Sequence, residues 1–228
     1  MKKLKSRLKQ KPFTISLFIA SVLFASHTLG NDVEPRLYSN VPVGVNFVSI
    51  VYGNSQGEVT FDSSVPLDDG DGDVDSLFLS YSRGLDIAGK SALLSIALPY
   101  ADLGLTGVLY GESASGRRKG LGDPRIRLAM NFYGAPATQL KDYIGYQQKT
   151  IVGVSVSVGM PFGRYLDDKL LNISANRWNV ITQVGVSHSV KRFTFESAVG
   201  VSVFTDNDEV LGARRLEQDP IGLLSLIH

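Results

Sequence analysis

The stretch Gly120–Pro136 reads G-L-G-D-P-R-I-R-L-A-M-N-F-Y-G-A-P, and the direction in which its two faces point decides the fold. After the Asp123-Pro124 turn signal, apolar residues alternate with other residues, the pairs being Arg125 and Ile126, Arg127 and Leu128, Ala129 and Met130, and Asn131 and Phe132. Successive side chains of a strand point to opposite faces, so one face is apolar and the other carries two arginines. In a soluble sheet the apolar face packs on a core. In a transmembrane barrel it meets lipid, and the charges face a polar lumen.

The segments on either side of this stretch repeat the alternation and predict eight strands. Their ranges are 45–55, 75–84, 91–101, the quoted stretch, 150–160, 178–190, 193–204 and 216–228. Most are about 10 or 11 residues long, which is the span of a tilted membrane strand, whereas soluble strands usually have about 5 or 6. Aromatic residues also stand at many strand ends, as in the interfacial girdles of membrane barrels.

The predicted connections alternate between long and short. The long ones are 57–73, 102–121, 164–176 and 205–216, and the short ones are 85–90 and 191–192. Only the polar connector 137–149 departs from this pattern, which is that of outer-membrane barrels. The sequence therefore predicts an all-β, antiparallel, up-and-down transmembrane β-barrel. A soluble periplasmic β-sandwich that binds ligands or has a structural role is the alternative, because alternation with turns also describes sandwiches.

The first thirty residues form a separate unit. Six lysines and arginines precede Phe13–Phe24, an apolar run of about a dozen residues, which suits a signal peptide and is short of the roughly 20 that a membrane-spanning helix needs. We therefore expect residues 1–30 to be a signal peptide cleaved after Gly30, with a single membrane anchor as the alternative, and residues 31–228 to form the barrel. This predicts export across the inner membrane and a location in the outer membrane.

Composition and motifs give little support to an enzyme or a metal protein. The 228 residues carry a net charge of +1, so nothing points to nucleic acid as a partner. There is no cysteine and there are three histidines, so neither a metal site nor a cofactor is expected. Nucleophile-elbow, zincin and P-loop motifs are missing. Ser187 and His188 are not expected to form a catalytic pair, because adjacent strand residues point to opposite faces.

The acidic run L-D-D-G-D-G-D-V-D (67–75) has the spacing of the first calcium ligands of an EF-hand. Val74 stands where that loop requires glycine, and Ser80 stands where it requires the closing glutamate. The run is therefore interpreted as a solvated loop, and weak divalent-cation binding stays open.

Six polar residues are candidates for the lumen of the barrel. They are Arg125, Arg127, Asn131, Asn179, Gln183 and Glu196. They either line a permeation path or fill the interior, as side chains do in small barrels. An arginine turned to lipid at mid-depth costs about 2–4 kcal/mol, so the inward direction of Arg125 and Arg127 is the firmer part of this prediction.

Several stretches of the chain resemble one known family, labelled as the MetA pathway of phenol degradation. They are Glu34–Phe47, Gly120–Pro136, Asp167–Trp178, Phe204–Asp208 and Leu216–Pro220. The resemblance implies an outer-membrane transporter-like barrel of Gram-negative bacteria, similar to those that pass hydrophobic or aromatic small molecules. Its implied partners are outer-membrane lipid, the barrel-assembly machinery and a hydrophobic solute.

The barrels of that family run on for several more strands, whereas this chain stops partway into the eighth predicted strand. We therefore expect a barrel that is incomplete at its C-terminus, with a natural eight-stranded barrel as the alternative. An unclosed barrel leaves unpaired strand edges in lipid, which is unfavourable.

Overall fold

The computed structural model describes residues 36–58, 67–169, 171–209 and 217–227, all within the unit Val33–His228. The predicted signal peptide lies outside these residues, and so do residues 210–216 of the predicted loop 205–216. In the described ranges there are nine strands and one short helix. They are β1 (Asn46–Glu58), β2 (Leu67–Ile87), β3 (Lys90–Leu109), β4 (Glu112–Leu121), β5 (Arg125–Tyr133), α2 (Leu140–Tyr143), β6 (Thr150–Gly159), β7 (Asn179–Val190), β8 (Phe193–Phe204) and β9 (Ile221–Ile227).

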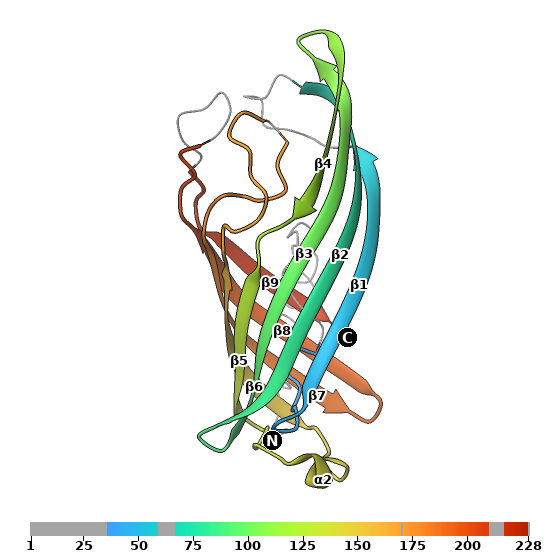
Figure 1. The fold of residues 1–228 in the computed structure, drawn as a ribbon. Helices are drawn as coiled ribbons and strands as arrows, with labels where there is room; N and C mark the ends of the chain where they lie inside the picture. The colour runs from blue at the N-terminus through green and yellow to red at the C-terminus, as the bar shows by residue number, and fades with distance from the viewer. Residues whose placement is uncertain (1–35, 59–66, 170, 210–216, 228) are drawn as a thin grey trace, which may run out of the picture. The chain divides into compact units, whose positions relative to one another are not determined.

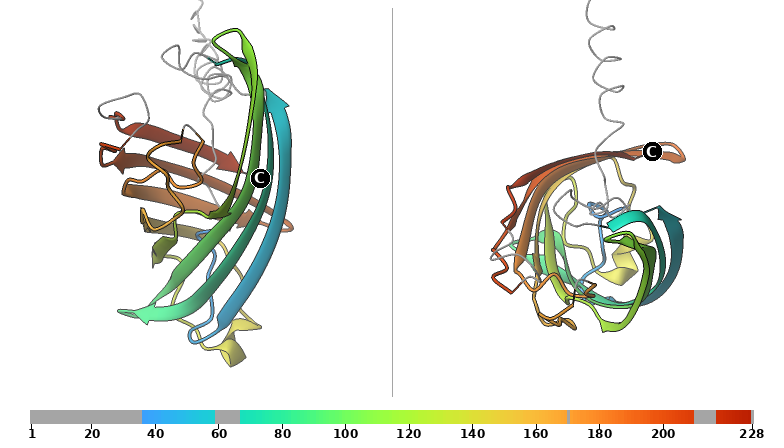
Figure 2. Two further views of the ribbon diagram at one scale, coloured as in Figure 1. Left: turned by 45° about the horizontal axis from the view of Figure 1, so that its top comes forward. Right: turned by 90° about the horizontal axis from the view of Figure 1, so that it is seen from above.

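All nine strands belong to one antiparallel sheet, which curls as Figure 1 and Figure 2 show. The order is β1-β2-β3-β5-β6-β7-β8-β9, and β4 pairs with β3 alone. The prediction of an all-β, antiparallel, up-and-down sheet is confirmed, in the form of a half-barrel whose edges are β1 and β9. The alternative of a two-sheet sandwich is wrong, since these strands form a single sheet.

The registers between strands assign each residue to a face. One continuous row across the sheet is apolar on every strand from β1 to β8 except β4, and consists of Val48, Tyr81, Ile96, Ile126, Val158, Val180 and Val203. The neighbouring row on the other face is mostly polar and consists, from β3 to β8, of Ser95, Arg127, Ser157, Ile181 and Ser202. Ile126 is 38% exposed, whereas Arg127 is 6% exposed. The arginine face is therefore the covered, concave side of the sheet.

Two predicted loops are strands in the structure. β3 continues to Leu109, turns through Tyr110 and Gly111, and returns as β4, so the prediction of a loop at 102–121 is wrong. Both turn residues have positive φ (52° and 84°), as a two-residue hairpin with the right twist requires. Turns of this kind are recognised in a sequence by Asn-Gly or Asp-Gly, and Tyr110 stands in place of the first residue, so the sequence did not predict the hairpin. The basic triplet Arg117–Lys119 consequently lies within β4 and not at a loop tip.

The acidic run was also assigned wrongly. Leu67–Asp73 begins β2 and pairs with the end of β3, with a register shift between Asp68 and Asp71. Aspartate and glycine are poor strand formers, so the sequence favoured a loop; long antiparallel pairing with β1 and β3 overrides that preference. The preceding residues 59–66 lie outside the described part of the chain.

Pro99 stands near the end of the predicted strand 91–101, and because β3 continues to Leu109 it lies in the middle of the observed strand. A proline has no N–H to donate, so an interior position is normally unfavourable. Here β4 pairs with β3 only from Tyr100 onward, and β5 pairs with it only up to Ala97. The proline thus stands at the break between β4 and β5 on this side of β3, while the pairing with β2 continues through it, and its carbonyl accepts a bond from Gly122 N (2.9 Å).

Candidate functional site on the concave face

The structure brings all six lumen candidates to the concave face. Arg125, Arg127 and Asn131 come from β5, Asn179 and Gln183 from β7, and Glu196 from β8. Arg127, Asn131, Gln183 and Glu196 are buried, and Arg125 and Asn179 are half-buried. The common direction follows from the strand registers. Their role in lining a path stays a prediction.

Small residues of β6 make room for these longer side chains. The concave face of β6 carries Gly153, Ser155, Ser157 and Gly159, which stand between β5 and β7. Arg125 lies opposite Gly159, and Arg127 lies opposite Ser157. A guanidinium on β5 can therefore extend over its neighbour without a clash. We call the concave side of β5 to β8 the polar wall.

Glu196 is the acidic centre of the polar wall. Its carboxylate accepts hydrogen bonds from Ser187 Oγ (2.9 Å) and from the backbone N–H of Arg36 (2.7 Å). Ser187 in turn accepts a bond from Gln148 Nε2 (2.7 Å). Buried charges are tolerated when hydrogen bonds replace the lost water, and this carboxylate has two such donors.

The residues that connect Arg36 to Val45 form a segment that sequence reasoning missed. This inner segment lies against the concave face, and Figure 2 shows the sheet curling around it. Asn131 Nδ2 donates to Ser39 O (3.0 Å), and Tyr143 Oη donates to Asn40 O (3.1 Å). The Ser91 hydroxyl bonds both backbone groups of Val41, at 3.0 and 3.1 Å. The segment has no period of 2 or 3.6, so only the family resemblance drew attention to it.

Tyr38 is the anchor of the inner segment. Its side chain is 3% exposed, and its hydroxyl lies 3.5 Å from Ser155 Oγ. Burial raises the pKa of this phenol, and Glu196 adds to the increase, while the Ser155 bond and the positive charge of Arg127 oppose it. The phenol hydroxyl thus lies within the field of both buried charges of the polar wall.

Loops next to the start of β5 and the end of β6 are held together by a second set of hydrogen bonds. Asp123, in the break between β4 and β5, accepts bonds from Gly163 N (3.1 Å), Ser174 Oγ (2.6 Å) and Ala175 N (2.9 Å). Asn207 holds the same loop from the other side by donating to Tyr165 Oη (3.1 Å). The loop between β6 and β7 is therefore tied to β4 and to the loop after β8.

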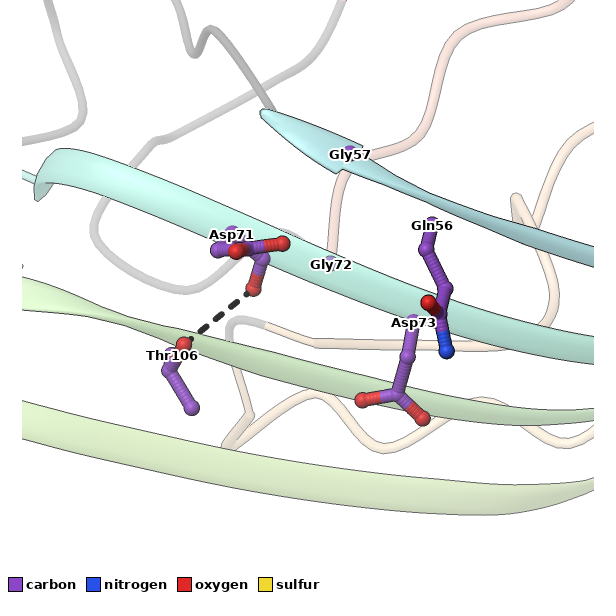
Figure 3. A pocket seen from close by; sticks show the side chains of 6 residues that line it. All are labelled: Gln56, Gly57, Asp71, Gly72, Asp73 and Thr106. Atoms are coloured by element: carbon purple, nitrogen blue, oxygen red, sulfur yellow. Dashed lines mark hydrogen bonds between the residues drawn. The ribbon is translucent and has the colours of Figure 1, made fainter.

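A pocket of about 440 Å³ lies near the far ends of β1, β2 and β3 (Figure 3). Its lining is polar and consists of Gln56, Gly57, Asp71, Gly72, Asp73 and Thr106. Asp73 is 3.9 Å from the guanidinium of Arg117, which also bonds Asp102 at 2.7 Å. Within the described residues no group of three or more His, Cys, Asp or Glu side chains is placed to hold a metal ion.

Ser187 and His188 do not meet. Ser187 points to the concave face and bonds Glu196, whereas His188 is exposed on the other face, with Nδ1 2.8 Å from Thr150 Oγ1. Ser187 and His188 thus do not make the hydroxyl–imidazole contact that a catalytic pair needs.

Comparison with known proteins adds a family. Residues 53–225 match the family described as "Putative MetA-pathway of phenol degradation". The chain belongs to this family. The matched range begins after the inner segment. No curated protein matches the sequence closely.

A solved structure shows the same fold. The crystal structure of the COG4313 outer membrane channel from Pseudomonas putida F1 is similar, with a TM-score of 0.63 and 19% sequence identity. The match covers 83% of this chain and 67% of that channel. At this identity the likeness concerns the fold. Among the helices of the described residues, none has the length and apolar character to cross a membrane.

Proposed function

We propose that this family member forms the wall of an outer-membrane β-barrel through which hydrophobic or aromatic small molecules pass. The observation that carries the proposal is the contrast between the two faces of one sheet. Large apolar side chains are exposed on the convex face, including Val48 (71%) and Ile50 (70%). Arg127, several serines and Glu196 are buried on the other face. A membrane barrel distributes its residues in this way, and a soluble protein does not.

The residues of the concave face suit an aromatic solute better than a purely polar one. Phe47, Val51 and Phe78 share the concave face with the arginines and are 46%, 53% and 44% exposed. Apolar contacts with a solute ring and hydrogen bonds to its polar group are thus both available. The family description, phenol degradation, agrees with a solute of this kind.

The proposal places the protein in the outer membrane, after export by an N-terminal signal peptide and insertion by the barrel-assembly machinery. It is a passage without a catalytic residue or a cofactor. The separation of Ser187 from His188 and the fold shared with an outer membrane channel favour this over an enzyme.

Cell fractionation tests the location. We expect the protein in the outer-membrane fraction, extractable with detergent only, with gel mobility that changes on heating. Release by osmotic shock would contradict a membrane wall.

Liposome swelling tests the passage. Ionised 4-hydroxybenzoate is a suitable solute because its charge slows diffusion through lipid, and a sugar of similar mass is the matched control. We expect faster swelling with the aromatic solute than with the sugar, measured against protein-free liposomes. Equal rates with and without protein for both solutes would exclude a passage.

A further inference from the structure

The Tyr38 side chain occupies a slot on the polar wall, and this slot has the dimensions and chemistry of a site for a free phenol. The side chain of tyrosine is itself a phenol that carries a methylene group at the para position. The structure therefore displays a phenol ring bound to the concave face, contributed by the chain itself. Tyr38 does not belong to the sheet and reaches this slot from the inner segment.

Two glycines form the floor of the slot. Gly153 of β6 and Gly185 of β7 are direct cross-strand partners. A Cβ added at Gly153 would lie 2.4 Å from the Tyr38 ring, and one added at Gly185 would lie 2.0 Å from it. Any other residue at these positions would collide with the ring. The ring thus lies directly on the backbone of two strands, in a slot that only the absence of side chains creates.

The hydroxyl end of the slot is polar and incompletely bonded. The distance of 3.5 Å between Tyr38 Oη and Ser155 Oγ is long for a hydrogen bond between hydroxyls, which usually lies near 2.7–2.8 Å. Gln183, the cross-strand partner of Ser155, is 2% exposed, and its Nε2 has no hydrogen-bond partner within the described residues. The Ser157 hydroxyl, two residues along the same face, is likewise buried and without a partner there.

A tethered ring cannot move freely toward these groups, whereas a free phenol can. An unmade hydrogen bond at a buried donor is unfavourable, so a ligand hydroxyl that reaches Ser155 or Gln183 gains affinity. Such a ligand needs a flat ring for the glycine floor and one hydroxyl for the far end. This combination describes a phenol and excludes toluene, which lacks the hydroxyl.

The inner segment can leave the slot without breaking the sheet. Most of its bonds go to side chains, including those of Asn131, Ser91 and Glu196. Only its last two residues, Gly44 and Val45, bond strand backbone, at Gly84 of β2. Departure of the part that carries Tyr38 therefore leaves the strand pairing intact, and it removes the Arg36 N–H from Glu196. Departure of Tyr38 would also uncover the buried residues of the polar wall.

We propose that the slot formed by Gly153, Gly185 and Ser155 is a binding site for phenols, and that Tyr38 occupies it as a tethered stand-in that a phenolic solute displaces. This inference rests on the proposed passage of aromatic molecules and names their subsite. In the resting state the inner segment covers the polar wall, and an arriving phenol takes the place of Tyr38 and releases the segment.

Binding of 4-methylphenol to the full chain, refolded in detergent, tests the site. Tyr38→Ala empties the slot, and we expect calorimetry to show an affinity at least about tenfold tighter than in the unmodified protein, where the ligand must compete with Tyr38. Toluene should bind the variant more weakly than 4-methylphenol. Adding Gly185→Val to Tyr38→Ala should abolish binding, because the valine fills the slot. Gly159→Ala in the same background is the matched control and should keep binding, since a Cβ there meets Asn179 at an ordinary 3.5 Å.

Equal affinity in all these variants, or no saturable binding to a folded Tyr38→Ala protein, would overturn the proposal. Gel mobility before and after heating reports folding. If Tyr38→Ala does not fold, Tyr38→Phe preserves the ring and removes its hydroxyl, and it should bind 4-methylphenol more tightly than the unmodified protein; unchanged affinity would again overturn the proposal. If no saturable binding is found while liposomes containing the protein still swell, the slot is rejected and the passage stands. If the phenol binds and the liposomes do not swell, the passage is rejected and the slot stands.

Discussion

Strands β5 to β8 and strands β1 to β3 belong to one sheet and differ in almost every local respect. In β6, β7 and β8 nearly every second residue is covered, whereas every residue of β1 except Gly53 is exposed. The strands β5 to β8 have 9 to 12 residues, while β2 and β3 have 21 and 20. The inner segment packs against the first group, and its Tyr38 is buried there. Alternating burial therefore depends on what covers the inner face as well as on the strand itself.

The largest expected effect tests whether the convex face of the polar-wall half meets lipid. Leu128→Arg places a charge near the middle of β5, and we expect it to destabilise the folded protein in lipid by about 2–4 kcal/mol. Phe132→Arg, near the end of the same strand and on the same face, should cost about 0–1 kcal/mol because it lies near the interface. Denaturant unfolding in lipid vesicles measures both. Equal costs would contradict a membrane-spanning β5.

The same substitution extends the comparison to the other half of the sheet. Ile50 of β1 lies on the same face as Leu79 and Leu98, and it is 70% exposed. Ile50→Arg should be as unfavourable as Leu128→Arg if lipid covers both halves. A negligible cost at β1 alone would restrict the lipid contact to β5 through β8.

The next effect tests whether the inner segment creates the alternation of the polar wall. Gly185→Ala brings a Cβ to 2.0 Å from the Tyr38 ring and should cost about 1–3 kcal/mol through overpacking. Proteolysis between Arg36 and Val45 should accelerate as the segment is displaced. Gly159→Ala has ordinary contacts and serves as the control. Unchanged stability and unchanged proteolysis in Gly185→Ala would show that Tyr38 does not need this slot.

The sequence predicted the covered half of the sheet better than the exposed half, for a physical reason. β8 was predicted with the bounds it has, and the two-residue turn at Lys191–Arg192 is confirmed, because the valines and small residues there leave one pairing register. Alternation along β5 likewise put Arg125 and Arg127 on one face, and in the structure that face is the concave one. The β3–β4 hairpin and the start of β2 were mistaken for loops, because acidic and glycine-rich sequence opposes strand propensity and only long-range pairing overcomes it.

The candidate site was predictable only in part. The six polar residues share a face because alternation fixes direction. Their burial depends on the inner segment, and nothing periodic in Arg36–Val45 indicates where it packs. The pairing of Gly153 with Gly185 beneath Tyr38 needs a register across two strands and a third, distant segment. Such a contact follows from tertiary structure and has no signal in the local sequence.

A smaller effect, confined to alkaline pH, tests the burial of Tyr38. Because burial raises the pKa of this phenol above its usual value of about 10, the neutral form is favoured in the folded state. Its contribution to stability is complete below the unfolded pKa and is lost as pH rises through the folded one. We expect the inner segment to dock less tightly above about pH 10, and the rate of proteolysis within the segment measures this change. Tyr38→Phe should remove that dependence, and its persistence in the variant would assign it to another group.

The smallest effect is expected in the long hairpins. Arg117 bonds Asp102 at 2.7 Å and approaches Asp73 at 3.9 Å, and its side chain is 61% exposed. Exposed ion pairs contribute little, because water and salt screen them. Arg117→Gln should therefore leave the midpoint of denaturant unfolding unchanged within error, at low and at high salt. A clear loss of stability at low salt would show that this pair is shielded from water, and that the hairpin half of the sheet is covered in the assembled membrane protein as the polar wall already is.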